Sequence, residues 1–235
     1  FNLLFCKSLK KPNIQILDIR DLSWEYLESK NFIQRIVKIF FRFIFKVKMN
    51  KFDAISCSNL YEYNYVKKYR KNNQQNIILY TNGIGSSQFD DLRSLKNKIH
   101  KKNKITISYI GNLGVAQNLS ILVKAANQFQ ELSFNIVGNG KEFLKLKQLS
   151  KNKKNITFYG RLKWEELLKI YSETDILYAQ LSNNFSSAMP SKLYEYLSSG
   201  KYIIYGGDGQ AKKFLTHLII IVSLKVIMSK NYLIN

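Results

Sequence analysis

The sequence predicts an α/β protein with a parallel sheet, because strand-like and helix-like segments alternate regularly after residue 104. The predicted strands are 105–110, 133–137, 155–159, 175–179 and 202–205, and the predicted helices between them are 119–130, 142–150, 164–174 and 190–199. Glycine directly follows four of the strands, at Gly111, Gly138, Gly160 and Gly206. Right-handed crossovers bring such strand ends to one edge of the sheet, where ligands bind.

The part before residue 105 is less regular. Short strands are predicted at 13–18, 52–58 and 76–80, with helices at 24–48 and 60–70. The polar, charged run from Ser86 to Lys104 resembles a linker. We therefore divide the chain into an N-terminal domain at 1–90, a linker at 91–104, a second domain at 105–213 and an atypical apolar tail at 214–235.

Composition indicates an anionic partner without identifying it. The chain has 37 Lys and Arg against 16 Asp and Glu, a formal net charge of +21. The lysines are scattered and no nucleic-acid motif accompanies them, so we expect no nucleic acid partner. Two cysteines give neither a disulfide framework nor a metal-binding spacing, and we expect no metal site.

The helix expected around residues 32–47 carries a narrow basic stripe on an otherwise apolar surface. Arg35, Lys38, Arg42 and Lys46 are spaced by three, four and four residues, which places them on one helix face. Such a helix is able to lie on an anionic membrane with its cations at the headgroups. The alternative is a helix buried in its domain with one wet edge. The run is too short and too charged to span a bilayer.

The segment Met189–Lys201 reads MPSKLYEYLSSGK and predicts a helix opened by proline and closed by glycine. Lys192 falls in the first turn, where unpaired amides and the helix dipole favour an anion. Glu195 lies three residues later on the same face. This pair suits a diphosphate and a ribose diol, although a surface ion pair explains the spacing as well. The glycines after the strands, likewise, suit either a nucleotide crevice or ordinary turns.

Four blocks together are similar to the C-terminal half of bacterial family 4 (group 1) glycosyltransferases, in the branch with a PSK motif that builds surface polysaccharides. They read YIGNLGVAQNLSILVKAA, FNIVGNG, NITFYGRL and PSKLYEYLSSGKYII. With FDAISCS and ILYTNGIGSSQFDD, the resemblance covers about Lys51 to Lys212. It implies two Rossmann-like domains of the GT-B type, and since the chain starts at Phe1 we expect the N-terminal, acceptor-side domain to be incomplete.

The resemblance also implies where a donor nucleotide binds. Glu195 corresponds to the carboxylate that holds the donor ribose, and Lys192 is a candidate for the diphosphate. The other donor-binding positions implied are Gly111, Asn112, Gly114, Gly138, Gly140, Gly160, Arg161 and Ser191. Ser187, Asn112 and Gln117 stand where many relatives have Glu, Arg and Lys. Charge stabilisation therefore falls on Lys192 and Arg161, and no catalytic residue is named.

The resemblance predicts a glycosyltransferase that moves a hexosyl or N-acetylhexosaminyl group from a UDP- or GDP-linked sugar, with retention and without a cofactor. The expected acceptor is a lipid-linked saccharide of bacterial O-antigen or capsule synthesis. The expected location is cytoplasmic and peripheral on the inner membrane, held by the 32–47 helix. Two alternatives stay open: a truncated, non-catalytic nucleotide-binding remnant, and a nucleotide-sugar 2-epimerase, for which the chain offers only His100 and His217.

Overall fold

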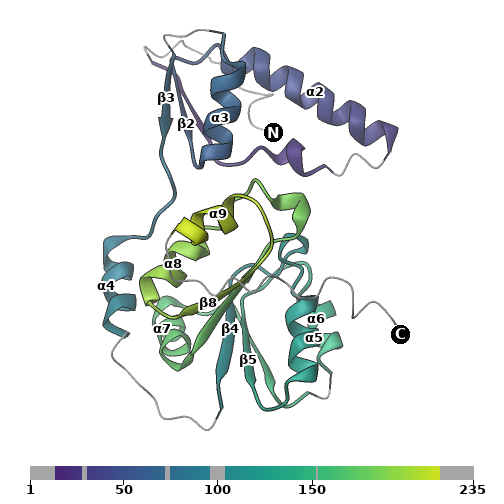
Figure 1. Cartoon of the computed structure of the whole chain (residues 1–235), viewed down its shortest axis with the longest axis vertical. Coiled ribbons are helices and arrows are strands. Elements are labelled where there is room, and N and C mark those ends of the chain that lie inside the picture. The colour runs from purple at the N-terminus through teal and green to yellow at the C-terminus, as the bar shows by residue number, and fades with distance from the viewer. Residues whose placement is uncertain (1–13, 28–30, 72–74, 96–103, 152, 218–235) are drawn as a thin grey trace. The chain divides into compact units, whose positions relative to one another are not determined.

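The computed structural model describes residues 14–27, 31–71, 75–95, 104–151 and 153–217, which form two compact units (Figure 1). Unit 1 runs to Asn82 and takes in Ser187–Met189, and unit 2 contains Gly83–Ser186 and the chain from Pro190 onward. Both units contain parallel sheets, and the predicted α/β fold is confirmed.

Unit 1 is built on a three-stranded parallel sheet in the order β1-β2-β3. Its elements are β1 (Ile16–Ile19), η1 (Ser23–Tyr26), α2 (Phe32–Met49), β2 (Ala54–Cys57), α3 (Leu60–Tyr69) and β3 (Asn76–Leu79). The register places Ile16 opposite Ala54 and Ala54 opposite Asn76. The core lies where α2 and α3 meet the sheet, with Phe45, Met49, Ile55 and Val66 buried together.

The single helix predicted over 24–48 is wrong in its first part. Residues 23–26 form one turn of 3-10 helix, and Leu27 has extended backbone with φ −66° and ψ 122°. The α-helix begins at Phe32, after Asn31, whose side-chain oxygen accepts a hydrogen bond from the amide of Gln34 at 2.9 Å. Asparagine at this position satisfies a free helix amide, and this local bond favours a start there over continuous helix.

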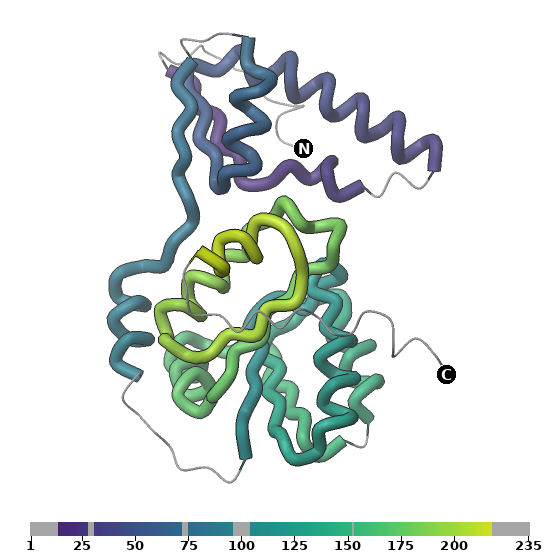
Figure 2. Tube along the Cα trace, in the orientation of Figure 1, coloured from purple at the N-terminus to yellow at the C-terminus, as the bar shows by residue number. Residues whose placement is uncertain are grey.

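Unit 2 contains a five-stranded parallel sheet in the order β6-β5-β4-β7-β8. Figure 2 shows the path of the chain through this unit, coloured from teal to yellow. Its strands are β4 (Thr106–Ile110), β5 (Ser133–Val137), β6 (Ile156–Gly160), β7 (Ile176–Gln180) and β8 (Tyr202–Gly206). The first strand of the unit, β4, is central, because the chain winds outward to β6 and then returns to β7 on the other side. This reversal between β4 and β7 is a topological switch point, where open α/β sheets bind ligands.

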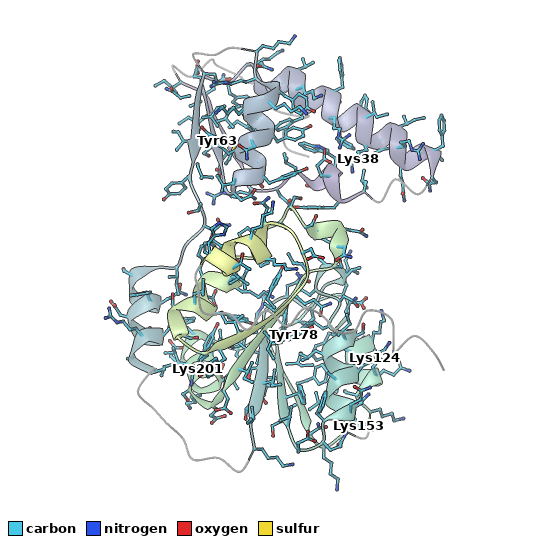
Figure 3. All side chains as sticks on the ribbon, in the orientation of Figure 1. Lys38, Tyr63, Lys124, Lys153, Tyr178 and Lys201 are labelled. Carbon is cyan, nitrogen blue, oxygen red and sulfur yellow. The ribbon has the colours of Figure 1, made fainter. Side chains whose placement is uncertain are left out.

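Helices cover both faces of this sheet, with α5 and α6 on one side and α7 and α8 on the other (Figure 1). The helical elements are α4 (Ser86–Ser94), η3 (Val115–Gln117), α5 (Ser120–Gln128), α6 (Phe143–Leu149), α7 (Trp164–Glu173), η4 (Asn183–Phe185), α8 (Lys192–Ser199) and α9 (Gln210–His217). All five residues of β4 are buried, as expected of a central strand. Tyr178 of β7, labelled in Figure 3, belongs to the same core as Tyr109 and Ile136.

The linker predicted at 91–104 is wrong at its start. Residues 86–94 form α4, which packs against α7 and α8 as part of unit 2. Leu92 is fully buried there, and the indole nitrogen of Trp164 donates a hydrogen bond to the Asp91 carboxylate at 2.8 Å. Although α4 is mostly polar, it has one buried apolar residue, Leu92, which holds this short helix against unit 2. Residues 96–103 lie outside the described part.

The predicted apolar tail, 214–235, starts too early. Residues up to His217 belong to α9, where Leu215 is buried and the Phe214 ring lies 5.6 Å from the Tyr194 ring. These two side chains therefore contribute to the core of unit 2. The remainder of the predicted tail, 218–235, lies outside the described residues.

Candidate donor-binding site

Three of the glycine-containing loops meet at the carboxyl edge of the unit 2 sheet. The Gly111 amide donates a hydrogen bond to the Val137 carbonyl at 2.9 Å, and the Leu113 amide donates to the Asn139 carbonyl at 2.9 Å. The Gly138 amide donates to the Gly160 carbonyl at 2.6 Å. The loops after β4, β5 and β6 are thus linked by their backbones beside the switch point.

Glycine is required where these loops touch. Gly138 has φ 130°, a conformation that other residues rarely adopt, and a Cβ added to it would overlap the carbonyl oxygen of Gly111. The amides of Gly114 and Gly140 are also used locally, by the Gln117 side chain at 3.1 Å and the Asn139 side chain at 2.8 Å. In this structure the glycines chiefly allow two loops to approach each other.

Lys192, the first residue of α8, extends to the glycine loop after β4. Its ammonium nitrogen donates a hydrogen bond to the Tyr109 hydroxyl and lies 4.1 Å from the centre of the Tyr109 ring. A Cβ on Gly111 would overlap this ammonium, so glycine gives the lysine its space. Burial lowers the pKa of Lys192 to about 7, against the opposing charge of Glu195. The site therefore holds a cation that lacks a carboxylate partner in the described ion pairs and is costly to keep charged.

Glu195, one turn further along α8, is partly buried and accepts a hydrogen bond from the Tyr171 hydroxyl at 3.0 Å. Burial raises the pKa of its carboxyl group, while the Tyr171 bond and the charge of Lys192 oppose that rise. Lys192 and Glu195 interact through space but turn toward different tyrosines. Among the described residues they form no ion pair within salt-bridge distance, so the simple surface ion pair does not explain them.

The other predicted positions are distributed along the same edge. The Asn112 carbonyl accepts a hydrogen bond from the Tyr109 hydroxyl at 2.6 Å, which connects the glycine loop to β4. Ser191 is exposed, and its side chain makes no capping bond to α8. Arg161 is exposed directly after Gly160, which has φ 66° and space for a Cβ.

Sequence reasoning missed the two tyrosines that hold Lys192 and Glu195. Tyr109 lies in the buried strand β4 and Tyr171 on the buried side of α7, and both are fully buried. The available signal was general: a buried tyrosine hydroxyl needs a polar partner. Nothing in the sequence indicated which partner each would take.

Within the described ranges, no group of three His, Cys, Asp or Glu side chains is arranged to hold a metal ion. Lys192 and the first turn of α8 each place positive charge at this edge of the sheet.

The sheet has a switch point, and a half-buried lysine, a half-buried carboxylate and close glycine loops lie at its edge. These features are common in α/β proteins that bind phosphorylated ligands at strand ends. The family model for glycosyl transferases group 1 matches residues 91–222, more than half of the chain. The chain belongs to this family. No curated protein sequence matches it.

Solved structures with the same fold are glycosyltransferases of low sequence identity. Anabaena HepE, in complex with UDP and glucose, matches with a TM-score of 0.57 and 13% identity over 84% of this chain and 54% of its own. WaaG, a glycosyltransferase involved in lipopolysaccharide biosynthesis, matches with a TM-score of 0.64 and 12% identity, over 88% of this chain and 60% of its own. Sucrose-phosphate synthase from Thermosynechococcus elongatus matches with a TM-score of 0.62 and 17% identity, over 83% of this chain and 50% of its own. The chain thus spans about half to three fifths of these proteins.

Proposed function

We propose that unit 2 binds a UDP- or GDP-linked sugar and that the chain acts in sugar transfer from this donor. The observation that carries the proposal is the Lys192 ammonium beside Gly111, at the strand edge where phosphates bind in such sheets. Family membership and the UDP present in the HepE structure support a nucleotide-sugar donor. The specific family 4 branch with its PSK motif is part of this proposal.

Each residue has a defined task in this proposal. Lys192 and the first turn of α8 stabilise the negative charge that grows on the diphosphate as the sugar departs. Glu195 accepts hydrogen bonds from the ribose hydroxyl groups. Arg161, exposed beside the third glycine loop, lies near the nucleotide base. The loop from Gly111 to Gly114 lies near the diphosphate and the sugar.

The transferred group is a hexosyl or N-acetylhexosaminyl unit, with retained configuration, and the acceptor is a lipid-linked saccharide in bacterial O-antigen or capsule synthesis. The similarity to WaaG, a glycosyltransferase involved in lipopolysaccharide biosynthesis, supports this choice. We also propose that the chain acts in the cytoplasm, peripherally on the inner membrane, through the helix at 32–47. No helix in the described part of the chain has both the length and the apolar character needed to cross a membrane.

Calorimetry with UDP, GDP and uridine tests the donor site. Lys192→Met removes the charge and preserves most of the side-chain length, and Glu195→Gln does the same for the carboxylate. We expect one diphosphate to bind wild type, Lys192→Met to weaken the diphosphate more than uridine, and Glu195→Gln to weaken both. Lys124→Met removes an exposed lysine of α5 and serves as the control. Failure of the folded wild type to bind either diphosphate would refute the proposal.

Transfer is measured separately from binding. If the chain binds the diphosphate tightly and yet moves no sugar from any UDP- or GDP-linked donor to a lipid-linked acceptor, the non-catalytic remnant is the better description. The two measurements therefore distinguish a donor-binding unit from an active transferase.

A further inference from the structure

Helix α2 exposes an apolar row along its whole length. Seven large apolar side chains on one face are between 46% and 75% exposed: Phe32, Ile33, Ile36, Ile39, Phe40, Phe43 and Val47. Their spacing of three, four and seven residues places them on a single stripe. Single exposed apolar residues are ordinary, whereas a continuous stripe of this kind marks a contact surface.

Three of the four cations in the basic stripe of the same helix contact other elements of unit 1. Arg42 forms two hydrogen bonds to the Glu25 carboxylate, at 2.7 and 2.6 Å, and the Lys38 ammonium lies 3.5 Å from the same carboxylate. The Lys46 ammonium lies 3.6 Å above the centre of the Tyr69 ring. Lys38, labelled in Figure 3, lies on the side of α2 that faces η1. The expectation of a buried helix with one wet edge is therefore wrong, since a whole row of its apolar side chains is exposed.

Glu25 fixes the rotation of α2 about its axis. Its carboxylate is almost fully enclosed and holds two cations of the helix, so a rotation of α2 would break charge-assisted hydrogen bonds. Phe45 and Met49 are buried on the same side of α2. The row from Phe32 to Val47 therefore faces away from the unit 1 core as a consequence of packing.

Charge determines which partner suits this row. Residues 32–49 contain five cations and no anion. Arg35 is exposed at one border of the row, and the Arg42 side chain at the same border keeps 42% exposure despite its ion pair. The whole chain carries a formal charge of +21. Apolar side chains bordered by long cationic ones suit an anionic bilayer surface, where the cations extend to the phosphates while the apolar face enters the acyl boundary.

We propose that α2 lies flat in the surface of an anionic membrane, with the row Phe32–Val47 in the acyl boundary and Arg35 and Arg42 at the headgroups. This proposal rests on the proposed function only in its purpose, which is to bring the chain to a lipid-linked acceptor. Membrane binding is measurable without sugar transfer or nucleotide, so the two proposals fail independently.

Vesicle flotation of the full chain tests the proposal. The vesicles contain phosphatidylcholine alone or in equal parts with phosphatidylglycerol. Ile39→Gln/Phe43→Gln removes two exposed members of the row, and Leu144→Gln/Tyr202→Gln removes two similarly exposed apolar residues of unit 2 as a matched control. We expect wild type and control to float with anionic vesicles and the α2 variant to bind about tenfold more weakly. Arg35→Glu is expected to weaken binding to anionic vesicles alone.

Three results would overturn the proposal: equal flotation of the α2 variant, an equal loss in the control, or no flotation of folded wild type. Sedimentation of the same samples without lipid tests a fourth result that would overturn the proposal, which is dimer formation through the row. A dimer that Ile39→Gln/Phe43→Gln converts to monomer identifies a second copy of the chain as the occupant of the row. Because the substituted side chains are exposed, the variants are expected to keep the wild-type circular dichroism.

Discussion

The ammonium of Lys192 lies 4.1 Å from the centre of the Tyr109 ring and donates a hydrogen bond to the Tyr109 hydroxyl, although the two residues are 83 positions apart. The same hydroxyl donates its proton to the Asn112 carbonyl at 2.6 Å. One buried tyrosine therefore positions both the lysine of α8 and the glycine loop after β4. This relationship holds the Lys192 side chain in a fixed position at the strand edge.

Removing the Tyr109 hydroxyl is expected to weaken diphosphate binding more than nucleoside binding. Tyr109→Phe keeps the ring but leaves the Lys192 ammonium without its hydrogen-bond acceptor, and a lost buried hydrogen bond costs about 1 kcal/mol. We expect UDP affinity to fall about fivefold, with little change for uridine, as measured by calorimetry. Tyr178→Phe, which removes another buried hydroxyl that contacts Gln180 instead, is the control. Equal loss for UDP and uridine would contradict a positioning role.

The pH dependence of UDP binding follows from the pKa of Lys192, which is about 7 in the free protein. A bound diphosphate favours the charged lysine and raises this pKa, so binding takes up a proton above pH 7. We expect UDP affinity to fall as pH rises from 7 to 9, by up to about tenfold per pH unit. Lys192→Met is expected to flatten the profile over this range. A wild-type profile that is equally flat would show that the lysine does not meet the phosphates.

Lys192 is also expected to reduce stability when it is charged. Its folded pKa lies below the unfolded value near 10.4, so the unfolded chain binds more protons between pH 7 and 10. The contribution of this group to the free energy of unfolding therefore rises with pH across that window. We expect Lys192→Met to stabilise the chain by about 1–3 kcal/mol at pH 6.5, and by less at pH 9. Thermal unfolding at both pH values measures the difference.

Because the glycine loops touch at Gly138, we expect a side chain at this position to reduce the free energy of unfolding strongly. A Cβ there would overlap the Gly111 carbonyl oxygen, whereas no atom lies within 4 Å of a Cβ added at Gly160. We expect Gly138→Ala to destabilise the chain by about 3 kcal/mol or more, and Gly160→Ala by about 1 kcal/mol for its positive φ alone. Denaturant unfolding compares the two. Similar losses would show that the loops separate at little cost.

Glu25 is expected to support the orientation of α2. Glu25→Gln leaves Arg42 and Lys38 without their shared carboxylate, and because Arg42 is partly exposed we expect a moderate loss of about 1–3 kcal/mol in the free energy of unfolding. Arg20, paired with Asp18 at 2.6 Å on the exposed surface, provides the control variant Arg20→Gln, for which we expect at most about 0.5 kcal/mol. Chemical denaturation measures both. Equal losses would indicate that the Glu25 pairs behave as surface pairs.

Local pattern was sufficient for most elements of unit 2. The strand β4 is rich in β-branched and aromatic residues and is followed by glycine. Helix α8 ends at Gly200, whose φ of 66° is the left-handed conformation that glycine favours at a helix end. Such signals are short in range and can be read from neighbouring residues. The prediction failed at α4, where the single buried residue Leu92 outweighed a polar composition.

The sequence by itself determined the α/β class, the alternation of strands and helices, and the residue types that gather after the strands. Tertiary structure alone decided that Lys192 turns to Tyr109 while Glu195 turns to Tyr171, because buried hydroxyl groups take whichever polar partner packing brings within reach. It also decided that Lys38 and Arg42 of α2 face Glu25, while the apolar row stays exposed. The periodicity of a helix defines its faces, but only the neighbouring elements determine which face is buried.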